Sequence, residues 1–84
     1  MDETQQRMYY NVLTDAWKFL KARLLSPDNP LWDNDNWWDC VMSEAGTVSG
    51  RYKDTECHDF AIRMMNTALN ELQRLAKRAK RGND

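Results

Sequence analysis

The sequence is poor in the residues that most often carry chemistry. Its 84 residues include one His and two Cys, Cys40 and Cys57, and no nucleotide-binding or catalytic motif. A structural zinc site needs four ligands at a recognisable spacing, which this small set of His and Cys does not supply. We therefore expect no metal, no cofactor and no enzymatic activity.

Turn-forming residues and long apolar runs are also scarce. Two Pro and three Gly argue against a turn-rich β fold, and a hydrophobic share of 42% argues against disorder. No apolar run is long enough to cross a bilayer, and the first residues do not resemble a signal peptide. We expect a helical, cytoplasmic protein that has no membrane contact and keeps both cysteines as free thiols.

The length limits the protein to one small hydrophobic core. We therefore treat residues 1–84 as a single helical domain. The formal net charge of −1 hides an uneven distribution, because residues 1–27 carry +1, residues 28–59 carry −6 and residues 60–84 carry +4. The middle of the chain is acidic, and the last third is basic.

The longest helical pattern predicts a helix over residues 55–80. Its apolar side consists of Cys57, Ala61, Met64, Met65, Ala68, Leu72, Leu75, Ala76 and Ala79. Thr55 provides a hydroxyl group suited to the N-cap. The opposite side carries cations, and we define the basic ridge as Arg63, Arg74, Lys77 and Arg81.

A second strong pattern predicts a helix over residues 3–25. One apolar face consists of Tyr9, Leu13, Ala16, Trp17, Leu20 and Leu24. Beside it lies another apolar strip, Met8, Val12 and Phe19, which makes the apolar surface wider than one partner helix can cover. Two partner helices would cover it, as in a three-helix bundle, but the strip could equally bind a second protein. We therefore select its three residues as candidate partner-binding residues.

Residues 26–30 contain both prolines and end this helix, because proline lacks an N–H and disfavours the α conformation of the residue before it. The Asp and Asn residues at positions 33–36 then offer several N-caps for a new helix.

Pattern and propensity disagree over the extent of this middle helix. Gly46 and Gly50 suggest a loop, since a glycine inside a helix costs about 1 kcal/mol relative to alanine. Helical spacing nevertheless continues across both glycines, at Trp38, Val41, Ala45, Val48 and Tyr52. We predict a helix over residues 36–52 and a short turn near residues 53–54. The alternative is a helix that ends at residue 45, followed by a loop.

Together these patterns predict an all-α fold, a three-helix up-down-up bundle. We expect its core to contain one stripe of large apolar side chains: Trp17, Leu20, Trp38, Val41, Met64 and Leu72.

Three of the four Trp residues, Trp32, Trp37 and Trp38, lie close together in the sequence. They either cap one end of the bundle or form an aromatic anchor for a partner, within a ring of acidic residues. The first interpretation is favoured because a core of this size needs large side chains. We keep Trp32 and Trp37 as candidate partner-binding residues.

Two further features have simpler structural explanations. The basic ridge could bind the phosphates of a nucleic acid, but cations are expected at a helix C-terminus and no aromatic residues alternate with them. Cys57 and His58 could form a nucleophilic pair, but adjacent residues of a helix point in different directions. We expect Cys57 to be a core residue and Cys40 to be exposed.

The apolar patterns resemble those of short uncharacterised helical proteins from mobile elements and phages of Gram-positive gut bacteria. The resemblance rests on the aromatic-rich first segment, the Trp-containing second segment that ends in Tyr52, and the motif F-A-x-x-x-M-N-x-x-L-N-E-L, which begins at Phe60. It implies an accessory role, such as binding a protein encoded by the host or by the element, and it implies no active-site residues.

The sequence therefore predicts a small, non-enzymatic helical protein that acts by protein–protein binding. The partner is another protein or a second copy of the chain, in a homodimer, since the acidic middle of one copy could pair with the basic end of another. The alternative function is that of a nucleic-acid-binding accessory factor that uses the basic ridge.

Overall fold

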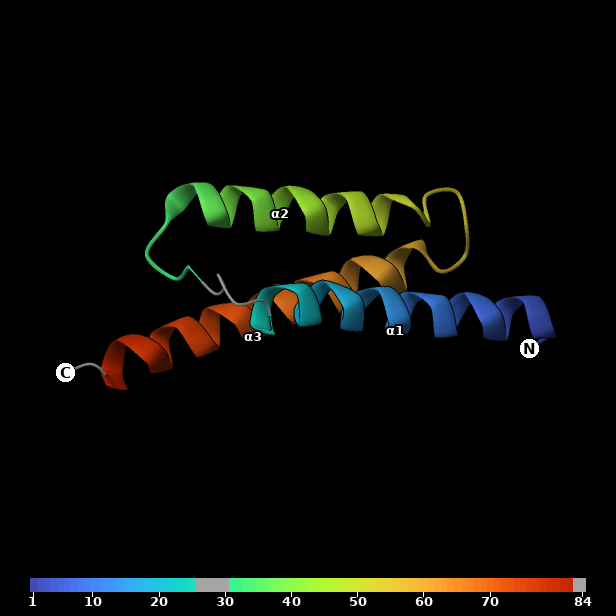
Figure 1. Cartoon of the computed structure of the whole chain (residues 1–84). Coiled ribbons are helices and arrows are strands. Elements are labelled where there is room, and N and C mark those ends of the chain that lie inside the picture. The colour runs from blue at the N-terminus through green and yellow to red at the C-terminus, as the bar shows by residue number, and fades with distance from the viewer. Residues whose placement is uncertain (26–30, 83–84) are drawn as a thin grey trace.

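The computed structural model describes residues 1–25 and 31–82, with side chains described up to residue 79. These residues form three helices and no strand: α1 (Glu3–Leu24), α2 (Asp35–Gly50) and α3 (His58–Gly82). The helices run up, down and up along an elongated molecule of 51 × 20 × 20 Å (Figure 1). The predicted all-α three-helix bundle is confirmed.

A capping box starts α1. The Gln5 N–H donates to Asp2 Oδ1 at 2.9 Å, and the Asp2 N–H donates to Gln5 Oε1 at 3.1 Å. These two bonds satisfy backbone donors that have no partner within the helix. At the other end, the Leu25 N–H donates to the Lys21 carbonyl. The predicted bounds of this helix are therefore correct to within one residue, and the predicted proline linker lies outside the described residues.

The structure resolves the conflict over α2 in favour of the periodic pattern. Asn34 caps the helix by accepting a hydrogen bond from the Trp37 N–H at 2.8 Å, and the helix then continues to Gly50. Val41 and Val48 are at most 5% exposed. Full burial of one valine stabilises the fold by about 1.5–3 kcal/mol, which outweighs the cost of about 1 kcal/mol for one helical glycine. The alternative, a helix that ends at residue 45, is wrong.

The turn between α2 and α3 is longer than predicted and covers residues 51–57. Its backbone reverses at Asp54, which has a left-handed conformation with φ of 68°. The Thr55 hydroxyl donates to the Tyr52 carbonyl at 2.6 Å and accepts from the Cys57 N–H at 3.2 Å. Thr55 therefore stabilises the turn, and α3 begins three residues later than the predicted start at residue 55.

The core consists of two clusters along the length of the molecule, and α3 contributes to both. The first contains Phe19, Val41, Ala45, Val48, Met65, Ala68, Leu69 and Leu72. The second contains Val12, Tyr52, Cys57 and Ala61. Val41 and Leu72 occupy the core as predicted, and Leu20, Trp38 and Met64 are partly buried around it.

The predicted inner face of α1 is wrong at its centre. Trp17 was expected in the core and Leu13 on the same apolar face, but the two residues are 55% and 51% exposed. Val12 and Phe19, expected on the surplus strip, are only 2% exposed. The helix is therefore rotated relative to the prediction.

Polar contacts with α2 and with the turn at residues 51–57 explain this rotation. Arg23 is 8% exposed, forms an ion pair with Glu44 of α2, and places its guanidinium 4.7 Å from the centre of the Phe19 ring. Asp15 accepts a hydrogen bond from the Tyr52 hydroxyl at 2.6 Å. Arg23 and Trp17 point about 120° apart on a helix with 3.6 residues per turn. Turning Arg23 towards α2 therefore leaves Trp17 on the outside.

Candidate protein-binding surface

Three large apolar side chains form an exposed strip on α1, which we call the α1 strip: Tyr10, Leu13 and Trp17. They are 68%, 51% and 55% exposed, respectively. Their spacing of three and four residues places them on one side of the helix over two turns. Single exposed apolar residues are common on proteins, but aligned aromatic residues are enriched at binding surfaces.

The candidate residues Met8, Val12 and Phe19 do not form this surface. Val12 and Phe19 belong to the two core clusters, and Met8 is partly buried against the second. The surplus apolar width of α1 is present, but it lies on the neighbouring side of the helix. Sequence analysis missed the α1 strip because Leu13 and Trp17 fit the core pattern better than Val12 and Phe19 when charged residues are ignored.

Trp32, Trp37 and Trp38 form a compact aromatic cluster at the start of α2. Trp37 lies edge-on to both other rings, with ring centres 5.5 Å from Trp32 and 4.8 Å from Trp38. The indole N–H of Trp38 donates to the Trp32 carbonyl at 2.9 Å, so one aromatic side chain fixes the backbone that leads into α2. Edge-to-face pairs of this kind add about 0.5–1.5 kcal/mol beyond the burial of area.

The aromatic cluster packs against the first core cluster, and all three Trp residues are partly buried. This is the position expected of a cap over the end of the bundle. The neighbouring carboxylates of Asp33, Asp35 and Asp39 are exposed. A partner-binding role of Trp32 and Trp37 stays a prediction.

Polar groups also link α1 to α2 and to the turn at residues 51–57. Besides the Arg23–Glu44 pair, Asp15 lies 3.6 Å from Arg51 and accepts the hydrogen bond from Tyr52. Burial, together with this bond to a carboxylate, raises the pKa of the Tyr52 hydroxyl above its usual value, because both disfavour the phenolate. These groups hold α1 against α2 and the turn that follows it.

The basic ridge lies on the exposed side of α3, as predicted. Arg63, Arg74 and Lys77 are exposed, whereas the side chain of Arg81 lies outside the described residues. Arg74 forms an ion pair with Glu71, which raises the pKa of the arginine and lowers that of the glutamate. This pair neutralises part of the ridge. A nucleic-acid interface here stays a prediction.

The two cysteines have different environments. Cys57 is 0% exposed within the second core cluster, whereas Cys40 is exposed, and both are free thiols. His58 is only partly buried and directly follows Cys57 at the start of α3. In the described part of the chain, no three His, Cys, Asp or Glu side chains are grouped so that they could hold a metal ion.

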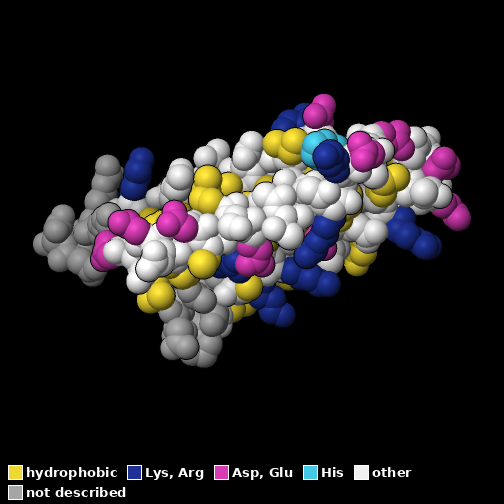
Figure 2. All heavy atoms as spheres, turned by 90° about the horizontal axis from the view of Figure 1, so that it is seen from above, with side chains coloured by type: hydrophobic (Ala, Val, Ile, Leu, Met, Phe, Trp, Pro, Cys, Tyr) yellow, Lys and Arg dark blue, Asp and Glu magenta, His cyan; other side chains and the backbone are white. Residues whose placement is uncertain are grey.

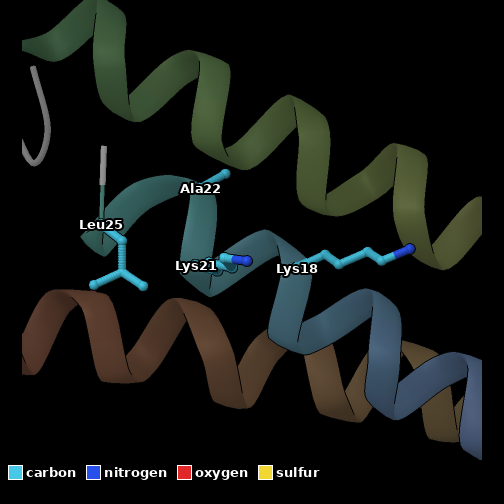
Figure 3. A pocket seen from close by; sticks show the side chains of 4 residues that line it. All are labelled: Lys18, Lys21, Ala22 and Leu25. Atoms are coloured by element: carbon cyan, nitrogen blue, oxygen red, sulfur yellow. The ribbon is translucent and has the colours of Figure 1, made fainter. Parts of the chain in front are cut away.

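The described part of the surface has several depressions. One shallow depression follows the last turns of α1, where Lys18 and Leu25 mark its two ends (Figure 3). A second lies between α2 and α3, and its lining includes Met42, Gly46 and Ile62. Seen from above α2, acidic side chains gather towards both ends of the molecule and apolar side chains appear in small groups (Figure 2).

Comparison with protein-family models, curated proteins and solved structures gives no match for this chain. Among the described residues, no helix has both the length and the apolar character needed to cross a membrane.

Proposed function

We propose that this protein is a non-enzymatic protein-binding module whose contact surface is the α1 strip. The observation that carries the proposal is the exposure of Tyr10, Leu13 and Trp17 on one side of a capped helix. Trp and Tyr are the residues most often found at the energetic centre of interfaces. The helix presents them in a fixed arrangement, so little conformational entropy is lost when a partner packs against them.

The partner surface that best fits the α1 strip is an apolar face of another helix. A ridge of three side chains spaced three and four residues apart packs into the groove between the corresponding rows of a facing helix. We further propose that the interaction takes place in the cytoplasm, where two free thiols are stable. The accessory role in mobile elements, implied by the resemblance alone, is part of this proposal.

A photo-crosslinking amino acid at position 17 tests the proposal in living cells. We expect a covalent adduct between this chain and a protein, and we expect Leu13→Glu in the same chain to abolish it. The matched control carries the same crosslinker at position 42, because Met42 is 53% exposed on α2 and lies outside the α1 strip. Absence of an adduct at position 17, or equal adducts at both positions, contradicts the proposal.

A further inference from the structure

We infer that the partner of the α1 strip is an acidic amphipathic helix of another protein. The apolar side of that helix covers Tyr10, Leu13 and Trp17, and its carboxylates meet the cations beside them. This inference rests on the proposed function and names the chemistry of the partner. Two observations carry it: the position of the α1 strip next to α3, and the sign of the charges on both helices.

The α1 strip lies on the side of α1 that borders α3. The rings of Tyr9 and Phe60 are in contact, with centres 4.9 Å apart, so the Tyr9 side of α1 faces α3. Leu13 follows Tyr9 by four residues and therefore lies on nearly the same side of α1. The helices α1 and α3 pack against each other and lie together below α2 in Figure 1. A partner that covers the strip therefore meets side chains of both α1 and α3.

The exposed charges of α1 near the strip are positive. We define the α1 cations as the exposed side chains Arg7, Lys18 and Lys21. They lie within about one helical turn of the strip, on the side away from α3, and form no ion pair in the described part of the structure. Over residues 4–24 the only carboxylate is that of Asp15, which already accepts a hydrogen bond from the Tyr52 hydroxyl. Glu3 precedes this stretch, in the first turn, where its charge favours the helix dipole.

Positive charge also borders the strip on the α3 side. Arg78 follows Phe60 by 18 residues, or five helical turns, so it lies on the side of α3 that contacts α1. Arg74 lies about one turn before Arg78, and both are exposed. Over residues 60–79 the only carboxylate is that of Glu71, which forms an ion pair with Arg74. The α1 strip is therefore an apolar row between two basic borders.

This combination selects the chemistry of the partner. The strip needs an apolar surface, and its borders need carboxylates on either side of that surface. An amphipathic helix with Asp or Glu beside its apolar side supplies both. The α1 strip of a second copy does not, because it would bring the α1 cations towards like charges. An anionic bilayer buries a broad apolar face, whereas the strip is one side chain wide.

Binding of three synthetic helical peptides to the full-length chain tests the inference. The peptides share Leu at positions spaced three and four residues apart, and they carry Glu, Gln or Lys at the positions beside them. We expect the Glu peptide to bind roughly ten-fold tighter than the Gln peptide at low salt, since each exposed ion pair contributes a factor of about 1.5 to 5. The Lys peptide should bind weakest, and high salt should reduce the differences. No binding, or equal binding of the three peptides, overturns the inference.

Variants of the chain locate the binding site of the Glu peptide. Trp17→Glu should abolish binding, whereas Met42→Glu, at a similarly exposed apolar position on α2, should leave it unchanged. Lys21→Glu should weaken the Glu peptide several-fold and strengthen the Lys peptide. Lys53→Glu is its matched control, because it makes the same charge change at an exposed position in the turn at residues 51–57, and it should alter neither peptide by as much. Equal effects of the two lysine changes contradict the inference, and circular dichroism checks that all variants keep their helical content.

Two measurements detect other occupants of the strip. A concentration-dependent dimer in sedimentation velocity, lost in Trp17→Glu, would assign the strip to a second copy. Cosedimentation with phosphatidylserine vesicles, lost in the same variant, would assign it to an anionic bilayer. Either result overturns the acidic helix.

The photo-crosslink at position 17 separates this inference from the function on which it rests. An adduct whose crosslinked segment is an acidic amphipathic helix supports both. An adduct with a protein segment that lacks acidic residues overturns the inference and leaves the protein-binding function standing. Absence of an adduct overturns both.

Discussion

Replacing Gly46 with alanine should make the protein more stable. Gly46 lies inside α2 and is exposed, and no atom outside its own helical surroundings lies within 4 Å of the position that an added Cβ would occupy. The substitution therefore removes the conformational cost of a helical glycine without creating a steric clash. The expected gain in the free energy of unfolding is about 0.8–1.0 kcal/mol.

Urea denaturation followed by circular dichroism measures this gain directly. The midpoint should move to higher urea at constant slope, and the melting temperature should rise by about 4–8 °C for a domain of this size. Asp54→Ala is the matched control, because the same new residue is placed where φ is 68° and should destabilise the protein by an amount on the order of 1 kcal/mol. A loss of stability in Gly46→Ala would refute the reasoning and would show that position 46 of α2 cannot accept a side chain.

Two further predictions concern the polar contacts of α1 with α2 and with the turn that follows it. Because the pKa of Tyr52 is raised in the folded protein, its contribution to stability is complete below pH 10, where the unfolded tyrosine is protonated, and it is lost as pH rises above 10. Tyr52→Phe should cost about 1.5 kcal/mol at pH 7 and flatten the alkaline decrease in stability, which denaturation at several pH values measures. Equal decreases in the two proteins would contradict this assignment. For the ion pair, Glu44→Leu should destabilise the protein by about 3 kcal/mol, because it leaves Arg23 buried without its partner. Arg23→Met should cost less, since the Glu44 side chain that it leaves unpaired is 50% exposed. Thermal denaturation ranks the two variants, and the reverse order would contradict the prediction.

The helices could be predicted from the sequence because their burial is periodic and local. The spacing of Val41, Ala45 and Val48 correctly carried α2 through two glycines, since the free energy of burying these side chains exceeds the propensity cost. The start of α3 was placed too early because the hydrogen bonds of Thr55 fit either a helix cap or a turn. The sequence does not distinguish these two roles of Thr55. In the structure, the left-handed conformation of Asp54 favours the turn.

The rotation of α1 could not be predicted in the same way. Counting apolar residues excludes Arg23 from the core, so the side that contains Val12 and Phe19 appears peripheral. Arg23 is buried because Glu44, on another helix, supplies the compensating charge, and the Phe19 ring covers its guanidinium. The hydrophobic pattern of one helix does not show that one of its residues forms an ion pair with another helix. Val12 and Phe19 were therefore expected on an exposed strip but are buried, although the surplus of apolar residues on α1 was correctly recognised.

The ion pair between α1 and α2 also makes the order of mutations matter in evolution. The side chain of its arginine is 10% exposed and that of its glutamate is 50% exposed. A lineage that first replaces Arg23 by an apolar residue keeps a glutamate that water can solvate, and it can lose Glu44 later at little cost. A lineage that first loses Glu44 must pass through a protein with an unpaired buried cation. Descendants that have an apolar pair at these positions should therefore have changed α1 before α2.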